Sequence, residues 1–156
     1  VHSIINRTFN QPEIGKHYLM KLLECKRIKF RDPPTGPNTQ VFTDATPYRL
    51  GWVHEQGKGT ARLHEDQPIM LTETLAALVS TYSAIIAGST DVTLHTDNMA
   101  TRAFLKRGAA KFLYNFNFNL HVHFIFILCK IKQLINFKAL YINTKDNPAD
   151  VLTRLE

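Results

Sequence analysis

Hydrophobic and polar residues along the chain change their spacing several times, and each change predicts a different element. Between residues 40 and 64, β-favouring residues come in short runs, which predict strands at about 40–44, 50–53 and 60–64 with a turn at 57–59. From 72 to 87 the apolar residues recur at helical spacing, which predicts a helix. Its apolar stripe consists of Leu75, Leu78, Val79, Tyr82, Ile85 and Ile86.

The second half continues with alternating strands and helices. The pattern predicts a strand at 91–96, a helix at 98–106, a buried helix at 120–135 and a strand at 139–142. Asn147 and Pro148 predict a last short helix, with asparagine as its cap and proline at its first position. The order β-β-β-α-β-α-α-β-α predicts an α/β fold. The apolar run at 120–135 is too short and too often interrupted by Lys and His to span a membrane, so we expect no membrane partner.

Composition divides the chain into two parts. Residues 1–37 carry many lysines and arginines among apolar residues at roughly helical spacing and end in the proline-rich stretch 32–37, which predicts a basic lead-in or connection segment. Residues 38–156 are then expected to form the main domain around a single core. The chain begins at Val1 without a secretory signal, which predicts a segment of a longer intracellular protein, in the cytoplasm, the nucleus or a viral particle. The two cysteines predict neither a disulfide framework nor a zinc site.

The chain is basic, with a formal net charge of +6 and a pI near 9.4. This charge favours an anionic partner such as nucleic acid, although many basic proteins bind none. Charge therefore supports a nucleic-acid function without establishing one.

Four carboxylates stand at the ends of predicted elements. Asp44 ends the first strand, Glu73 lies in the first turn of the 72–87 helix, Asp97 ends the fourth strand and Asp150 lies in the first turn of the last helix. Each taken alone is also explained as a helix cap or a helix-start charge. Together they suit two Mg²⁺ ions, which orient an attacking water and stabilise the leaving oxygen of a phosphodiester. Without metal such a cluster repels itself and raises at least one pKa.

Four short motifs resemble those of RNase H domains from retroelements and reverse-transcribing viruses, and are most similar to hepadnavirus polymerases. They are Thr43-Asp44-Ala45-Thr46-Pro47, Thr72-Glu73-Thr74-Leu75-Ala76-Ala77, Thr96-Asp97-Asn98 and Asn147-Pro148-Ala149-Asp150-Val151-Leu152-Thr153-Arg154. The resemblance spans residues 40–154. It implies a five-stranded mixed sheet, with three antiparallel strands followed by parallel additions and flanking helices.

The resemblance also implies an activity, which is hydrolysis of the RNA strand of RNA/DNA hybrids during reverse transcription. Asp44, Glu73, Asp97 and Asp150 are then the catalytic carboxylates and the ligands of two Mg²⁺ ions, for which Mn²⁺ substitutes. The implied partners are the hybrid and the polymerase portion of the same polyprotein.

Candidate substrate contacts come from the side chains beside the carboxylates and from nearby cations. Hybrid binding needs cations for phosphates and polar groups that sense the 2′-OH. The candidates are Thr46, Asn98, Arg102, Lys106 and Lys145. Many RNase H domains have a histidine in the loop before the last aspartate, whereas residues 143–147 contain none, and Lys145 is expected to substitute for it electrostatically.

Three other functions remain open on the sequence. The first is a catalytically inactive RNase H-like module that binds nucleic acid, which the four intact carboxylates disfavour. The second is an integrase-, transposase- or resolvase-type DNA nuclease on the same fold. The third is a structural domain of a capsid or scaffold, which explains the basic charge but not the acidic motifs.

Overall fold

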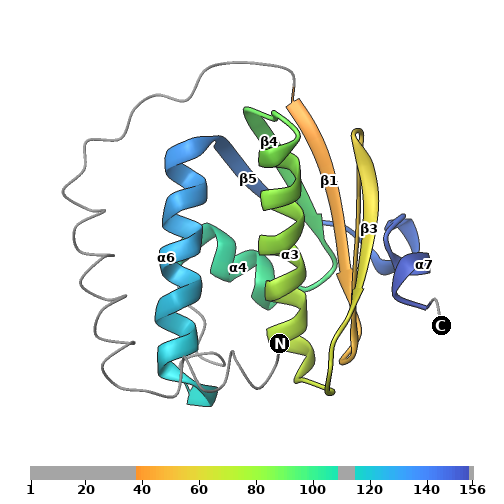
Figure 1. The fold of residues 1–156 in the computed structure, drawn as a ribbon, viewed down its shortest axis with the longest axis vertical. Coiled ribbons are helices and arrows are strands. Elements are labelled where there is room, and N and C mark those ends of the chain that lie inside the picture. Colours follow the sequence, from red (N-terminus) through yellow and green to blue (C-terminus); the bar gives the residue numbers. More distant parts are fainter. Residues whose placement is uncertain (1–37, 109–114, 155–156) are drawn as a thin grey trace.

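The computed structural model describes residues 38–108 and 115–154. They form one mixed β-sheet with helices on both faces (Figure 1). The predicted basic segment 1–37 lies outside the described residues, so its separation from the main domain stays a prediction.

The sheet contains five strands in the order β3-β2-β1-β4-β5. The strands β1 (Asn38–Ala45), β2 (Arg49–His54) and β3 (Gly57–Arg62) form an antiparallel meander. The strands β4 (Asp91–Thr96) and β5 (Asn136–Tyr141) are added to β1 in parallel. The predicted five-stranded mixed sheet is therefore confirmed.

Several strand boundaries differ from the prediction, and the starts of β3 and β5 differ by three residues. The expected turn at 57–59 is wrong, because Gly57 pairs with His54 and already belongs to β3, which leaves Glu55 and Gln56 as the turn. Gly59 pairs with Trp52, and a Cβ atom on Gly59 would lie only 2.3 Å from the Trp52 indole. This glycine therefore makes room for the indole inside a strand. In addition, β5 begins at Asn136, three residues before its predicted start.

Three longer helices cover one face of the sheet, as Figure 1 shows nearly edge-on. They are α3 (Ile69–Ile86), α4 (Met99–Arg107) and α6 (Phe118–Leu134). Asn98 caps α4, its Oδ1 accepting a hydrogen bond from the backbone N–H of Thr101 at 2.9 Å. The predicted helix at 72–87 begins three residues early, directly after Pro68, so Glu73 lies in its second turn rather than its first.

The last helix, α7 (Asp150–Thr153), packs on the opposite face against β1, β2 and β3. It follows the 3-10 turn η1 (Thr144–Asp146). The predicted cap at Asn147 is wrong, because the helix begins three residues later. The Asn147 side chain is buried instead, its Nδ2 donating a hydrogen bond of 2.9 Å to the carbonyl oxygen of Thr43. Asn147 therefore fixes the C-terminal segment to β1.

The main core lies between the sheet and the three longer helices. Fully buried residues from β1, β4, α4 and α6 form its centre: Val41, Leu94, Phe104, Ile131 and Ile135. By length and composition α3 passes the test for a membrane-spanning helix, but it packs against β1, β2 and β4 as the central helix of this core. The predicted burial of the 120–135 segment is confirmed by Leu120, Phe124 and Leu128, which are almost fully buried.

Candidate active site

The parallel pairing of β1 and β4 brings two of the predicted carboxylates together. Thr43 pairs with Thr96, so the residues that follow them, Asp44 and Asp97, lie side by side at the C-terminal ends of neighbouring strands. Asp44 is the penultimate residue of β1, and Asp97 comes directly after β4. The edge formed by the carboxyl ends of parallel strands is a common position for ligand sites in α/β folds.

Glu73 reaches this edge from α3 because that helix approaches the sheet closely. The helix face that carries Glu73 also carries Ala76, Ala77 and Ser80, and all four are buried. Small side chains let a helix backbone come near a sheet. As a result, one ligand oxygen each of Asp44, Glu73 and Asp97 lies within 4.8 Å of the others.

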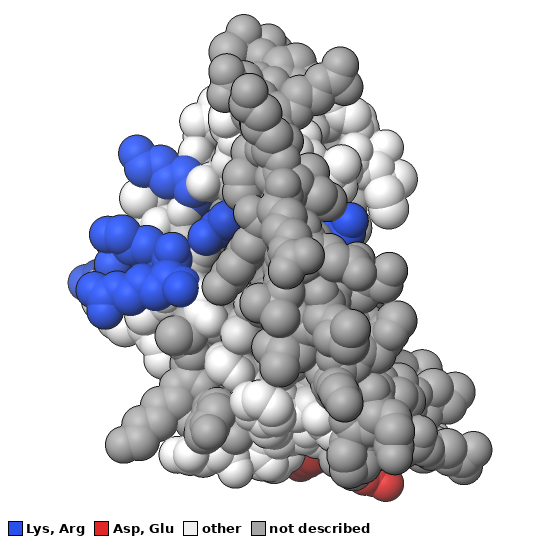
Figure 2. All heavy atoms as spheres, turned by 90° about the vertical axis from the view of Figure 1, so that its left-hand side faces the viewer, with Lys and Arg blue, Asp and Glu red and all other residues white. Residues whose placement is uncertain are grey.

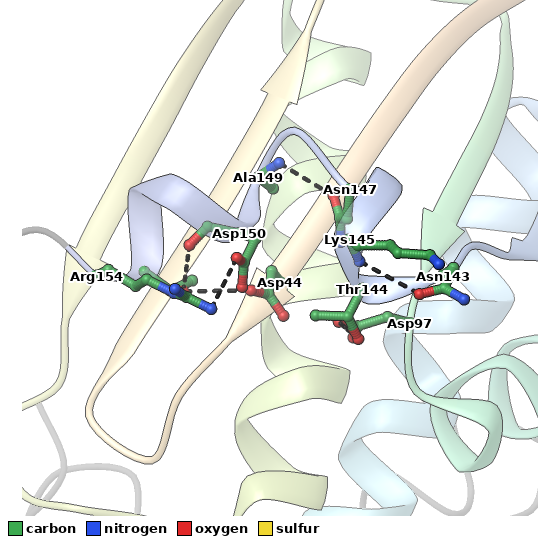
Figure 3. A network of polar contacts seen from close by, with 10 residues as sticks. Asp44, Asp97, Asn143, Thr144, Lys145, Asn147, Ala149, Asp150 and Arg154 are labelled. Carbon is green, nitrogen blue, oxygen red and sulfur yellow. Dashed lines mark hydrogen bonds and ion pairs between the residues drawn. The ribbon is translucent and has the colours of Figure 1, made fainter.

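Asp150 approaches Asp44 from the other face of the sheet, on α7 (Figure 3). This approach depends on Gly51, which pairs with Asp44; a Cβ atom there would lie 3.1 Å from both Leu152 and Thr153. Asp150 also forms an ion pair with Arg154, 3.0 Å from Nη2 to Oδ2. The structure thus gathers Asp44, Glu73 and Asp97 in one cluster, with Asp150 beside Asp44.

The carboxylates perturb one another electrostatically. Burial raises the pKa of Glu73 to about 9, with further contributions from the charges of Asp97 and Asp44. Burial raises the pKa of Asp44 to about 7, helped by the charge of Asp97 and by a hydrogen bond with Asp150. The backbone N–H of Ala45 opposes both shifts. Near neutral pH, Glu73 therefore carries a proton that a cation would have to displace.

The cluster fits a hard divalent cation. Glu73 Oε2 is buried without a hydrogen-bond partner, and in residues 38–108 and 115–154 no lysine or arginine pairs with Asp44, Glu73 or Asp97. A buried polar atom without a partner is costly, and a cation would remove that cost. Carboxylate oxygens are the ligands that Mg²⁺ prefers.

Two threonine hydroxyls hold the aspartates, and sequence reasoning did not single them out. Thr153 Oγ1 donates to Asp44 Oδ2 at 3.2 Å, and Thr144 Oγ1 donates to Asp97 Oδ2 at 3.0 Å. For Thr153 a signal was present, because it lies three residues after Asp150 on the same face of a helix. For Thr144 the sequence held none, since the contact joins a loop to a residue 47 positions earlier.

Two of the predicted substrate residues mainly serve the local fold. Thr46 Oγ1 accepts a hydrogen bond from the backbone N–H of Arg49 at 3.1 Å, within the β1–β2 turn. Asn98 caps α4 through Oδ1, while its Nδ2 lies 3.5 Å from Met70 Sδ. Both lie within two residues of a carboxylate in the chain.

The three predicted cationic contacts differ in exposure. Arg102 is half-buried on α4, and its Nε is buried without a hydrogen-bond partner. Lys106 and Arg107 are exposed at the C-terminal end of α4, and Lys132 Nζ donates to the Lys106 carbonyl oxygen at 3.4 Å. Figure 2 shows lysines and arginines gathered on one flank of the face that carries α6. Lys145 is exposed on η1, beside the carboxylates (Figure 3).

Comparison with known proteins gives no sequence relative. No protein-family model matches the chain, and no curated protein matches it. Function therefore has to be argued from the structure and its site.

Solved structures do match the fold. The N-terminal RNase H domain of Rv2228c from Mycobacterium tuberculosis aligns with a TM-score of 0.58 at 10% identity, covering 75% of this chain and 91% of that one. LC11-RNase H1, solved in complex with an RNA/DNA hybrid, gives 0.53 at 14% identity, with coverage of 74% and 91%. The protease–reverse transcriptase of prototype foamy virus gives 0.52 at 13% identity over 83% of this chain, which spans only 23% of that protein. The chain therefore has the RNase H-like fold.

Proposed function

We propose that this chain is a metal-dependent ribonuclease H that hydrolyses the RNA strand of RNA/DNA hybrids. The observation that carries the proposal is the cluster of Asp44, Glu73 and Asp97, whose ligand oxygens lie within 4.8 Å of one another. The cluster stands at the carboxyl ends of β1 and β4 in an RNase H-like fold. Three clustered carboxyl groups, two of them buried, are hard to explain as a purely structural feature.

The proposed cofactor is Mg²⁺, bound as two ions, with Mn²⁺ as a substitute. Asp44, Glu73 and Asp97 would hold one ion, and Asp44 and Asp150 would provide ligands for the second. Bound metal supplies a water of lowered pKa and stabilises charge on the leaving oxygen of the phosphodiester.

The chain's own residues fix the carboxylates in place. Thr153 and Thr144 donate hydrogen bonds to Asp44 and Asp97 and so restrict the rotation of both side chains. Such outer contacts orient ligands and tune their affinity for metal. Glu73 is held by the packing of its helix on the sheet, with its Oε2 free to take a ligand.

Substrate binding is proposed along α4, which begins beside Asp97 and ends in Lys106 and Arg107. A helix of nine residues spans about 13 Å, so its two ends would meet phosphates at different positions along a hybrid. Thr46, Asn98, Arg102 and Lys145 remain proposed contacts nearer the carboxylates. LC11-RNase H1, which shares the fold, was solved with an RNA/DNA hybrid bound.

The proposed setting is reverse transcription, with this chain acting as a segment of a polyprotein beside its polymerase portion inside the cell or viral particle. The motifs at Asp44 and Asp150 support it, as does the fold shared with the foamy virus protease–reverse transcriptase.

The test is cleavage of a hybrid with the RNA and DNA strands separately labelled, in Mg²⁺, in Mn²⁺ and in EDTA. We expect cuts in the RNA strand only, dependent on metal and lost in Asp97→Asn. Asp66→Asn is a matched control, because Asp66 is exposed in the loop before α3 and lies outside the cluster.

Other outcomes point to the competing functions. Cutting of double-stranded DNA in place of RNA would contradict the proposal and favour an integrase- or resolvase-type nuclease. A folded protein that binds the hybrid without cutting it would favour a non-catalytic module.

A further inference from the structure

The clearest feature that the proposed activity leaves unused is an apolar groove along α3. Two adjoining hollows of about 490 and 750 Å³ share Leu75, Val79 and Ile127 in their walls, so they form one continuous groove between α3 and α6. The smaller hollow, of about 490 Å³, is almost entirely apolar, with Tyr82 and Ile86 in its lining. Ile86 is 84% exposed.

The groove consists of the apolar stripe of α3. Leu75, Val79, Tyr82 and Ile86 recur at intervals of three or four residues, and with Leu78 they line the smaller hollow. The opposite face of α3 packs against the sheet, so the side chains of this stripe point away from the sheet. Only Leu78 among these five is fully buried. Leu75, Val79 and Tyr82 are half-buried and Ile86 is exposed, so the groove presents contiguous, partly exposed apolar surface, which is typical of an interaction site.

We propose that residues 14–31 of this same chain form an amphipathic helix that lies in this groove. Ile14, Tyr18, Leu22 and Cys25 recur at intervals of three or four residues, which would give such a helix an apolar face. Four of the six lysines and arginines of the segment would lie on its other faces. Lys21 and Lys29 would fall beside the apolar residues, with their ammonium groups extended to solvent. A helix that lays its apolar face into an apolar groove is a common mode of recognition.

The length and the entry point of the chain fit this occupant. Eighteen helical residues span about 27 Å, the same length as the 18 residues of α3. The described chain starts at Asn38, and the next residue contacts the end of α3, with Thr39 Oγ1 and Ser89 Oγ 2.9 Å apart. Ile86 lies at that same end of α3. The stretch 32–37 reaches at most about 20 Å, enough to turn the chain from β1 into the groove.

The test is hydrogen exchange on the full chain, 1–156. We expect the backbone amides of residues 15–31 to be protected, and Ile86→Asp to speed their exchange at least tenfold. Ile86 is largely exposed, so its replacement leaves the core intact. Met99→Asp is the matched control, because Met99 is 58% exposed on α4 and does not line the groove, and it should leave that exchange unchanged.

A second pair of variants changes residues of the segment 14–31 itself. Leu22→Ser should increase the binding of an apolar fluorescent dye several-fold by opening the groove, whereas Glu24→Ser, on the polar side of the segment, should not. The proposal is overturned if residues 15–31 exchange at the rate of an unstructured peptide. It is also overturned if their protection survives Ile86→Asp, or if it appears only at concentrations where sedimentation detects a dimer, since a second copy would then cover the groove.

Discussion

The two long faces of α3 differ in a way that is unusual for a core helix. The face toward the sheet carries Glu73 and small side chains such as Ala76 and Ser80, all of them buried. The other face carries large apolar side chains such as Val79 and Ile86, which remain partly or largely exposed in the groove. The close approach of Glu73 to strands β1 and β4 requires small side chains on the sheet side of the helix. Large apolar side chains such as Val79 and Ile86 therefore lie on the other side, where they are less buried. The position of Glu73 at the site is thus accompanied by partly exposed apolar surface on the opposite side of the same helix.

The largest effect is expected from Glu73→Gln. Glutamine keeps the shape but cannot become a carboxylate ligand, so metal-dependent cleavage should fall at least about 100-fold. The melting temperature in EDTA should stay unchanged or rise, because burial keeps the pKa of Glu73 near 9 and the native carboxyl is largely protonated at neutral pH. A variant that lost stability along with cleavage would instead make Glu73 a structural residue.

The next largest effect is expected on the pH dependence of stability without metal. Folding raises the pKa of Asp44 to about 7 and that of Glu73 to about 9, from ordinary values near 4. These groups stabilise the metal-free fold below pH 4, and that contribution is lost as pH rises toward 9. Melting temperature in EDTA should therefore fall over this range.

Mg²⁺ should reverse that loss. Because a bound cation displaces the protons, it should raise the melting temperature more at pH 8 than at pH 5.5. At 100 times the Kd the gain is about 2.7 kcal/mol, or several degrees. Scanning calorimetry with Mg²⁺ and with EDTA at both pH values measures it. An equal metal effect at both would mean that the cation does not bind at these two carboxyls.

The contrast between the faces of α3 is tested directly by enlarging one side chain on each. Ala76→Leu forces extra carbons between helix and sheet and should cost about 1 to 3 kcal/mol of unfolding free energy. Val79→Leu adds one methylene where the proposed helix 14–31 would rest, and because that contact can shift more easily than the sheet, the cost should stay below about 1 kcal/mol. Urea denaturation measures both. Equal costs would mean that the groove side is as tightly packed as the sheet side.

A smaller effect is expected from Thr153→Val, which removes the hydroxyl that donates to Asp44. Loss of such an outer contact should weaken metal binding or cleavage about tenfold or more. Thr90→Val is a suitable control, since that hydroxyl also contacts an aspartate, Asp91, but at the opposite end of β4. Titration of Mg²⁺ against the cleavage rate compares them, and equal losses would deny Thr153 any role at the metal site.

The smallest effect is expected from Lys106→Ala. One phosphate contact fewer should weaken hybrid binding a few-fold and lower the slope of log affinity against log salt by about 1. Lys58→Ala, exposed on β3, is the control. Binding isotherms at several salt concentrations measure the slope. An unchanged slope would remove Lys106 from the proposed interface.

Much of the fold was readable from local sequence. The strand β4 has the predicted bounds, and α4 begins at Met99, one residue after its predicted start, with Asn98 as its cap. Each of these features depends on residues a few positions apart, where periodicity and capping chemistry operate.

Contacts between distant segments were not readable. The hydrogen bond from Asn147 to Thr43 joins residues 104 positions apart, and it draws the asparagine away from the predicted cap. The role of Thr144 is hidden for the same reason, because its hydroxyl contacts Asp97, 47 positions earlier in the chain.

Gly51 has a consequence for the order in which the protein is made. By leaving space for α7, it lets Asp150 and Thr153 meet Asp44, a residue from the beginning of the sheet. All five strands precede α7 in the chain, so a ribosome finishes the sheet before it adds the fourth carboxylate. Under the proposed function, translation itself would delay the nuclease until the domain is finished.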